Sequence, residues 1–487
     1  FSGGFFTEPR LLAAFVAWVL VLALAIVGPS PLPRSLPGGL AVGGLALLTV
    51  WSALSVSWAP LHGPAIENVQ RLVLYLGALV VAIGVLRSPR IMRAVEPALA
   101  AGATIVIGYG MAGRLVPGVV HLAHSVRATG RLEQPITYWN AEGALAAVGL
   151  VLCARLAGDR SRPIWMRSLA AASAAPLGAG VFLSYSRGAI AVAVLGLIVL
   201  VAALRTRSQL WAAGVVLATA VATAACSAAL PGVASLDGGL GARERDGAVM
   251  LAILVLLTAV AAVVTARRSV SERRGTVPDP RLPGSRRLGT IAAVVVGLAA
   301  VGLVAGGLSE KSAGSDVAGA RTVRLTSANS NRYEYWRIGL RAFTHHPIAG
   351  LGSGGFRVFW LRERSIAESV QEVHSLELEM AAELGIVGLL AFGLMVAGVG
   401  LAARRAIRRH YTIAAGSCAA IVVWLLHASI DWDWQLPAVS LPAIVLAGAL
   451  VAIAESAGEP TERDPAIGER EDLTAAAAGD RNPVPAT

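Results

Sequence analysis

Runs of about 20 apolar residues recur along this chain, and each is long enough to cross the roughly 30 Å of hydrocarbon in a bilayer. Only helices and closed barrels satisfy all their backbone polar groups in that environment. Of the 487 residues, 55% are hydrophobic and only 15% are charged, whereas soluble proteins have about 25% charged residues. The sequence therefore predicts an all-α fold, a polytopic bundle of transmembrane helices.

We expect about 13 spans, which divide the chain into four parts. An N-terminal bundle of about ten spans occupies 1–308 and is followed by a large, mostly helical loop over 309–383. Further membrane helices occupy 384–454, and the acidic tail 455–487 is expected to be disordered because it has no apolar periodicity. The spans are expected at 11–28, 38–58, 67–86, 94–113, 139–157, 165–183, 188–204, 209–229, 247–266, 289–308, 384–403, 411–428 and 436–454.

The basic residues give the expected orientation, because short cytoplasmic loops of membrane proteins are enriched in Lys and Arg. The net charge of +11 is therefore a topology signal and does not indicate nucleic-acid binding. The basic loops, expected to be cytoplasmic, are 87–93, 155–167, 205–207, 267–288 and 404–410. The alternating loops, expected outside, are 114–138, 184–187, 230–246, 309–383 and 429–435. The C-terminus is then cytoplasmic and the N-terminus lies outside, and the opening FSGGFFTEPR predicts one further span before Phe1.

The turn SYSRGA places Arg187 at the expected outer end of a span. An arginine near hydrocarbon is costly unless it is paired or faces water, and its planar fork suits a bidentate grip on phosphate oxygens. The adjacent Gly188 would let a ligand approach closely. The alternative is an ordinary snorkelling arginine at a span end.

The large loop contains the longest polar, aromatic and basic interval of the chain, which begins NSNRYEYWRIGLRAF. Its aromatic residues recur at helical spacing, and Arg332 and Arg337 fall away from that face, toward water or an anionic ligand. An amphipathic helix lying on anionic headgroups is the alternative. The following glycine turn over 345–356 has no G-K-[ST] and no preceding strand, so we expect a structural turn that docks the helix onto the bundle.

A histidine, His374, opens the segment VHSLELEMAAELG that leads into the next span. Its imidazole titrates near neutral pH and could take a proton from an attacking hydroxyl, although a lone histidine is more often structural.

Two other outer segments carry candidate substrate-lining residues. Arg131 and Asn140 lie at the mouth of a span, and Asp431 belongs to HASIDWDW, where D-W-D matches the D-x-D pattern of metal-dependent glycosyltransferases. We favour a structural or acceptor-lining role and expect no metal, because nucleotide sugars are scarce outside the membrane. The three cysteines lie in apolar runs without spaced partners, which argues against a zinc site.

The motifs GRLEQPITYWNAEG, SYSRGA, NRYEYWRIGLRAFTHHPIAGLGSGGF, VHSLELEMAAELGIVGLL and HASIDWDW occur in this order. Their order and placement resemble the O-antigen ligase/polymerase family of bacterial envelope proteins, over roughly residues 67–450. One departure is Ser375, since the family usually has asparagine after this histidine.

The resemblance implies a GT-C-like, inverting glycosyltransferase of the bacterial inner membrane that needs neither cofactor nor metal. Its donor would be a glycan on polyprenyl pyrophosphate, and its acceptor a sugar hydroxyl of a glycan or glycolipid on the outer side. By position, Arg187 and Arg332 would hold the pyrophosphate and His374 would act on the acceptor hydroxyl. The alternative is a flippase or transporter of lipid-linked glycans, but the chain lacks the repeated halves typical of transporters.

Overall fold

The computed structural model describes residues 2–28, 30–277, 320–321, 325, 330–409 and 411–456, and within them it is helical with no strand. This confirms the all-α prediction. The long helices are α1 (Thr7–Val27), α2 (Leu36–Ser55), α3 (His62–Val85), α4 (Pro89–Leu115), α5 (Trp139–Gly158), α8 (Arg187–Leu204), α9 (Arg207–Ala228), α11 (Leu240–Arg273), α16 (Leu376–Arg409), α17 (Tyr411–Ala428) and α18 (Pro437–Glu455). The shorter elements are η1 (Ser2–Gly4), α6 (Ile164–Ala172), α7 (Ala174–Leu183), α10 (Pro231–Ala234), α14 (Arg332–His345), α15 (Phe356–Glu363) and η2 (Asp433–Gln435).

Within the described residues, 11 helices are long and apolar enough to cross a membrane, with α6 and α7 together forming one of them, Ile164–Leu183. The apolar helix α17 is shorter than these. The expected span at 289–308 lies outside the described residues, as do most of the predicted tail and the first part of the large loop. Every other expected span falls on a helix of the bundle.

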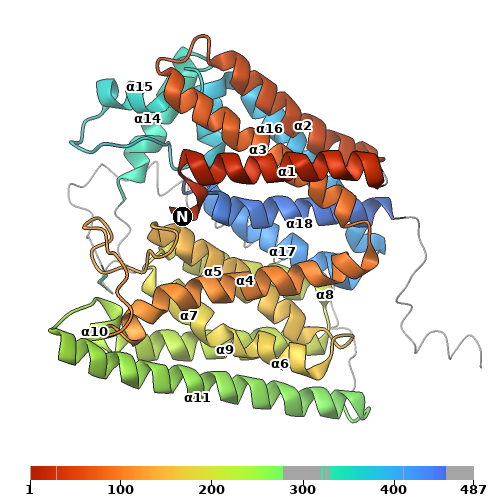
Figure 1. The fold of residues 1–487 in the computed structure, drawn as a ribbon, viewed down its shortest axis with the longest axis vertical. Helices are drawn as coiled ribbons and strands as arrows, with labels where there is room; N and C mark the ends of the chain where they lie inside the picture. Colours follow the sequence, from red (N-terminus) through yellow and green to blue (C-terminus); the bar gives the residue numbers. More distant parts are fainter. Residues whose placement is uncertain are drawn as a thin grey trace, which may run out of the picture.

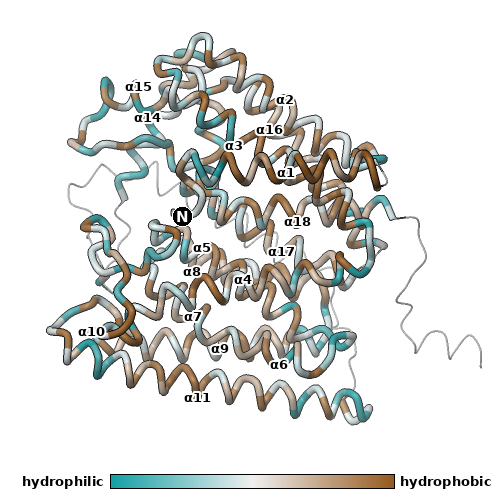
Figure 2. The backbone as a smooth tube through the Cα atoms, in the orientation of Figure 1, coloured by the Kyte–Doolittle hydropathy of each residue, from teal (hydrophilic) through white to brown (hydrophobic). Residues whose placement is uncertain are grey.

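The long helices lie side by side, with α14 and α15 at one end of the bundle (Figure 1). Apolar residues dominate the middle of these helices and hydrophilic residues gather at their ends (Figure 2). The centre is α5, whose spanning window is entirely buried and which packs against α4, α7, α8, α9 and α17. Small residues permit this: a Cβ at Gly149 would lie 2.9 Å from the Ala103 side chain, the close approach typical of membrane helices.

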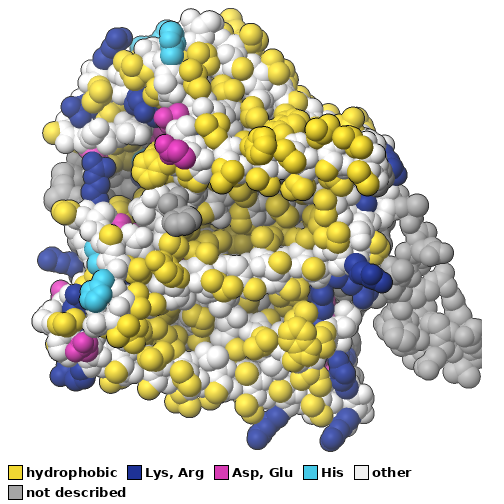
Figure 3. Space-filling model, viewed as in Figure 1, with side chains coloured by type: hydrophobic (Ala, Val, Ile, Leu, Met, Phe, Trp, Pro, Cys, Tyr) yellow, Lys and Arg dark blue, Asp and Glu magenta, His cyan; other side chains and the backbone are white. Residues whose placement is uncertain are grey.

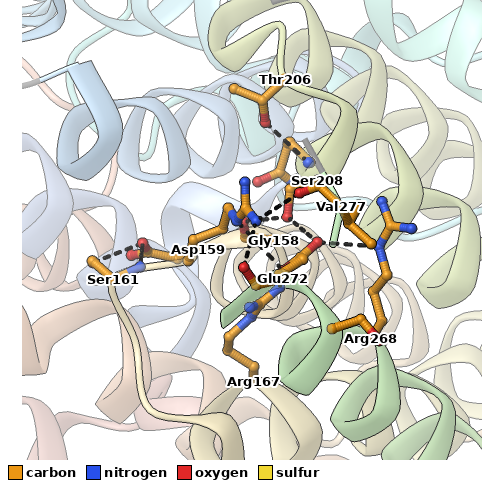
Figure 4. Close-up of polar contacts among 12 residues, drawn as sticks. Gly158, Asp159, Ser161, Arg167, Thr206, Ser208, Arg268, Glu272 and Val277 are labelled. Atoms are coloured by element: carbon orange, nitrogen blue, oxygen red, sulfur yellow. Dashed lines mark hydrogen bonds and ion pairs between the residues drawn. The ribbon is translucent and has the colours of Figure 1, made fainter. Parts of the chain in front are cut away.

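A buried ionic network closes the end of the bundle at which α11 finishes (Figure 4). Glu272 accepts hydrogen bonds from Arg167 at 2.7 Å and from Arg268 and Ser208, both at 3.2 Å. These contacts join α11 to α6 and α9, and a buried carboxylate requires such partners. The space-filling view shows an apolar belt between two ends that carry arginine side chains (Figure 3). The loops 155–167 and 267–277 therefore share one end, as the alternation of basic loops predicted.

At the opposite end, the glycine turn docks onto α16, in agreement with its predicted structural role. The N–H groups of Leu351 and Gly352 donate to the carbonyls of Ala382 and Glu383 at 3.0 and 2.9 Å. Gly350 has φ +70°, and a Cβ there would lie 2.3 Å from the backbone of Glu383. The turn meets α16 where the helix is itself interrupted by Gly385, at φ +63° and ψ −160°.

We expect Gly350→Ala to destabilise the protein by about 2–4 kcal/mol, because it combines a disfavoured backbone angle with a clash against backbone. Thermal melting of the purified protein in detergent measures this. Gly393→Ala in α16 is the matched control, since a Cβ there meets nothing within 4 Å and alanine favours helix. Equal melting temperatures for the two variants would contradict the docking role of the turn.

Candidate functional site

The loop between α17 and α18, residues 429–436, is where side chains from five helices meet. Tyr75 of α3 donates to the Trp434 carbonyl at 2.8 Å, and Ser429 donates to Glu377 of α16 at 2.7 Å. Residues that begin α5 and α14 bond to Asp431, and a residue of α17 bonds to Asp433. We call this loop the 429–436 hub. Because its partners come from distant parts of the chain, only the folded bundle can assemble it.

Asp431 is the most heavily bonded side chain of the hub. Its buried carboxylate accepts hydrogen bonds from the Tyr138 hydroxyl at 2.6 Å, from the Asn140 amide at 2.8 Å and from the Arg332 guanidinium. Burial alone would raise the pKa of the Asp431 carboxyl, but Arg332 and the neighbouring histidines hold it below its ordinary value. Asp431 is therefore ionised at neutral pH and holds Arg332 in place.

His374 lies beside this carboxylate and just before α16. Its ring packs against Tyr335 and Trp432, with ring centroids 5.1 and 6.3 Å apart. Its backbone has φ +58°, which is uncommon outside glycine, and its carbonyl accepts a hydrogen bond from Trp336 at 3.1 Å. A strained backbone held by neighbours is a feature that often marks functional positions.

The hydrogen bonding of His374 defines its tautomer. Nδ1 lies 2.9 Å from the Glu372 carbonyl oxygen, and since a carbonyl only accepts, Nδ1 carries the proton and Nε2 presents a lone pair. Burial lowers the pKa of His374, and Arg332 lowers it further against the opposing effect of Asp431. The imidazole is thus neutral at pH 7 and able to accept a proton.

The structure brings four of the predicted site residues into this cluster: Arg332, His374, Asn140 and Asp431. Arg187 is the first residue of α8, which packs against α17. The adjacent Gly188 packs against the end of α17 and the start of the hub. A Cβ built on Gly188 would lie 3.3 Å from the His427 ring and 2.8 Å from the Ile430 side chain. Arg187 therefore lies at the same end of the bundle, next to the residues that lead into the hub.

The other two predicted residues lie in different surroundings. Arg131 is buried, stacks over Trp139 with 3.6 Å from its guanidinium carbon to the ring centroid, and donates to the carbonyls of Ala128 and Arg127. These contacts of Arg131 connect the loop before α5 to the first residue of that helix. Arg337 pairs with Glu334 at 2.6 Å, and its side chain is 63% exposed.

The predicted site residues did not include Tyr138, Trp432 or the second acidic residue of D-W-D, Asp433. Tyr138 bonds to Asp431 and stacks against Trp432 with ring centroids 4.6 Å apart. The signals in the sequence were the D-W-D pattern for Trp432 and Asp433, and for Tyr138 its placement in the motif that contains Asn140. The two carboxylates of D-W-D turn to different partners, Asp433 to His427 and Asp431 to Arg332. Within the described residues, no group of three or more His, Cys, Asp or Glu side chains is arranged to hold a metal ion.

Residues 238–393 match the family model described as O-antigen ligase. The matched range includes Arg332 and His374, together with α14, α15 and the first half of α16. No curated protein matches the chain. Residues 238–393, about a third of the chain, are thus similar to the O-antigen ligase model and lie among many apolar helices, which supports an assignment to the O-antigen ligase/polymerase family.

Proposed function

We propose that this O-antigen ligase/polymerase-type membrane enzyme moves a glycan from a polyprenyl-pyrophosphate carrier to a sugar hydroxyl of an acceptor glycan or glycolipid. The observation that carries the proposal is the meeting of Arg332 and a neutral His374 at Asp431, at one end of a bundle of apolar helices. An arginine suited to phosphate and an imidazole suited to proton transfer are the two groups that such a reaction needs.

The proposed reaction is a single displacement at the anomeric carbon. The acceptor oxygen forms a bond to that carbon while the bond to the pyrophosphate oxygen breaks, which inverts the configuration. The acceptor proton moves to Nε2 of His374, and the departing pyrophosphate takes the electron pair of the broken bond. Arg332 and Arg187 stabilise the charge that develops on the leaving group, so no metal is invoked in this mechanism.

Asp431 has a supporting role in this mechanism. The carboxylate raises the pKa of Arg332 in spite of burial, which acts in the opposite direction, and keeps the guanidinium charged. Asp431 bonds to one terminal nitrogen of a fork that has five N–H donors, so the same guanidinium can also hold phosphate oxygens.

The proposed setting is the bacterial inner membrane, with the 429–436 hub and the 330–375 segment on the outer side and the C-terminus in the cytoplasm. Support comes from the basic loops 155–167 and 267–277, which lie at the opposite end of the bundle and are typical of cytoplasmic loops.

Transfer from a purified polyprenyl-pyrophosphate oligosaccharide in vitro tests the function, and Arg187 gives the first prediction. We expect Arg187→Ala to reduce transfer at least about 100-fold, because it removes a positive group from the leaving group. Arg187→Lys should also be impaired, since a point charge does not reproduce a bidentate fork. Arg207→Ala, at an exposed position beyond the far end of α8, is the control. Wild-type transfer by Arg187→Ala would remove this residue from the donor site.

A further inference from the structure

His427 and Asp433 form a buried ionisable pair at the hub that the mechanism above does not use. His427 lies at the end of α17 and Asp433 in η2, and Nδ1 of the imidazole is 2.5 Å from Oδ2 of the carboxylate. Their side chains are 1% and 0% exposed. Within the part of the chain that the structure describes, Nε2 of His427 has no hydrogen-bond partner. A buried polar atom without a partner is costly and calls for an explanation.

The ring edge that carries this unpartnered nitrogen faces the first turn of α8. A Cβ built on Gly188 would lie 3.3 Å from both Nε2 and Cδ2 of His427. The first turn of a long helix offers backbone N–H groups and the positive end of the helix dipole to an anion. Ser186 caps this turn by accepting from the N–H of Ala189, and Arg187 is its first residue.

We propose that His427, oriented by Asp433, is a further binding residue for the donor pyrophosphate and donates Nε2–H to a phosphate oxygen at the first turn of α8. The inference rests on the proposed function, since it extends the donor site assigned to Arg187. Asp433 accepts from Nδ1–H and can balance the charge of an imidazolium ring. In that imidazolium form Nε2 also carries a proton and can donate to an anion. Gly188 keeps side-chain atoms away from Nε2, because a Cβ there would lie 3.3 Å from this nitrogen.

Two substitutions of His427 separate this role from a structural one. The amide nitrogen of asparagine sits where Nδ1 was, so His427→Asn keeps the contact with Asp433 and removes Nε2. The longer glutamine places its amide nitrogen near Nε2 instead. A binding role predicts that His427→Asn loses affinity and that His427→Gln retains most of it. A purely structural tie to Asp433 predicts the reverse order.

The experiment titrates the purified full chain in detergent with farnesyl diphosphate, and with farnesol to control for the prenyl group. We expect His427→Asn to raise the Kd for farnesyl diphosphate about tenfold, the loss typical of a hydrogen bond to a charged group, with farnesol binding unchanged. Gly188→Ala should weaken diphosphate binding as well, because its methyl group would lie 3.3 Å from Nε2 and crowd the space beside it.

Arg187→Ala, measured in parallel, separates a failure of the proposed donor site from a failure of the role of His427 alone. Unchanged diphosphate affinity in Arg187→Ala would overturn the donor site itself, and the role of His427 with it. Lost affinity in Arg187→Ala, together with wild-type affinity in both His427→Asn and Gly188→Ala, would overturn the role of His427 alone. Melting temperatures show whether each variant is folded. Should both His427 variants fail to fold, Gly188→Ala decides the question.

Discussion

His374→Ala is expected to reduce glycan transfer by about 100- to 10,000-fold, the range typical of a lost general base. The expectation follows from its bonding, because Nδ1 faces the Glu372 carbonyl and Nε2 is left as the basic atom. Initial rates with a polyprenyl-pyrophosphate oligosaccharide and saturating acceptor measure it. Donor binding should be retained, since the lost group acts on the acceptor. His346→Ala, at an exposed position in the same segment, is the matched control.

The assignment of His374 as a base also predicts the direction in which the transfer rate changes with pH. The pKa of His374 lies below its ordinary value of 6.5, so the active, neutral ring persists at pH 7 and transfer falls only as the pH drops through that lowered pKa. Asp431→Asn removes the carboxylate that opposes the lowering, and the acid limb of the profile should then move to still lower pH. A rate that rises on acidification between pH 7 and 6 would contradict the assignment of a base.

Arg332→Ala carries the second large expected effect, a loss of about 100- to 1,000-fold in transfer, because one charge-stabilising donor to a leaving group is removed. Both the donor affinity and the rate at saturating donor should fall, since the guanidinium contacts the pyrophosphate before and during its departure. Farnesyl diphosphate titration and initial rates measure the two effects separately. Arg332→Lys should restore only part of the activity, because it keeps the charge but not the planar fork.

Arg341→Ala provides the control on the same helix, as its side chain is 53% exposed and pairs with Glu363. This variant should transfer at the wild-type rate. If Arg332→Ala instead lowers the melting temperature and leaves the rate of the folded fraction unchanged, the Arg332–Asp431 contact is a structural tie and the proposed donor site loses one of its two arginines.

Part of the candidate site could be proposed from the sequence, and part of it could not. Arg332 and His374 could be selected from the sequence because a polar, aromatic segment stands out in an apolar chain and has few reasons to exist without function. The hub could not be predicted in the same way. Asp431 meets Asn140 across 291 residues of sequence, and nothing local to either residue specifies the other.

Arg131 and Arg337 show that the sequence does not give the contacts of an arginine side chain. Both are arginines beside polar segments, so the sequence made them candidates for substrate contact. Arg131 is held by Trp139 and by backbone carbonyls, and the largely exposed Arg337 pairs with the buried Glu334. The direction of a guanidinium depends on the neighbours that packing supplies, and that information is absent from residue type and spacing.

The class of fold and the positions of the spans in the described residues follow from the amino-acid sequence alone. The reason is that the length and apolarity of a membrane helix are local properties, set by the thickness of the bilayer. Tertiary structure decided which polar groups share one site. Asp431 accepts hydrogen bonds from Arg332 and Asn140, and Asp433 bonds to His427. A buried carboxylate needs such partners, and the packing of the helices decides which residues lie close enough to provide them.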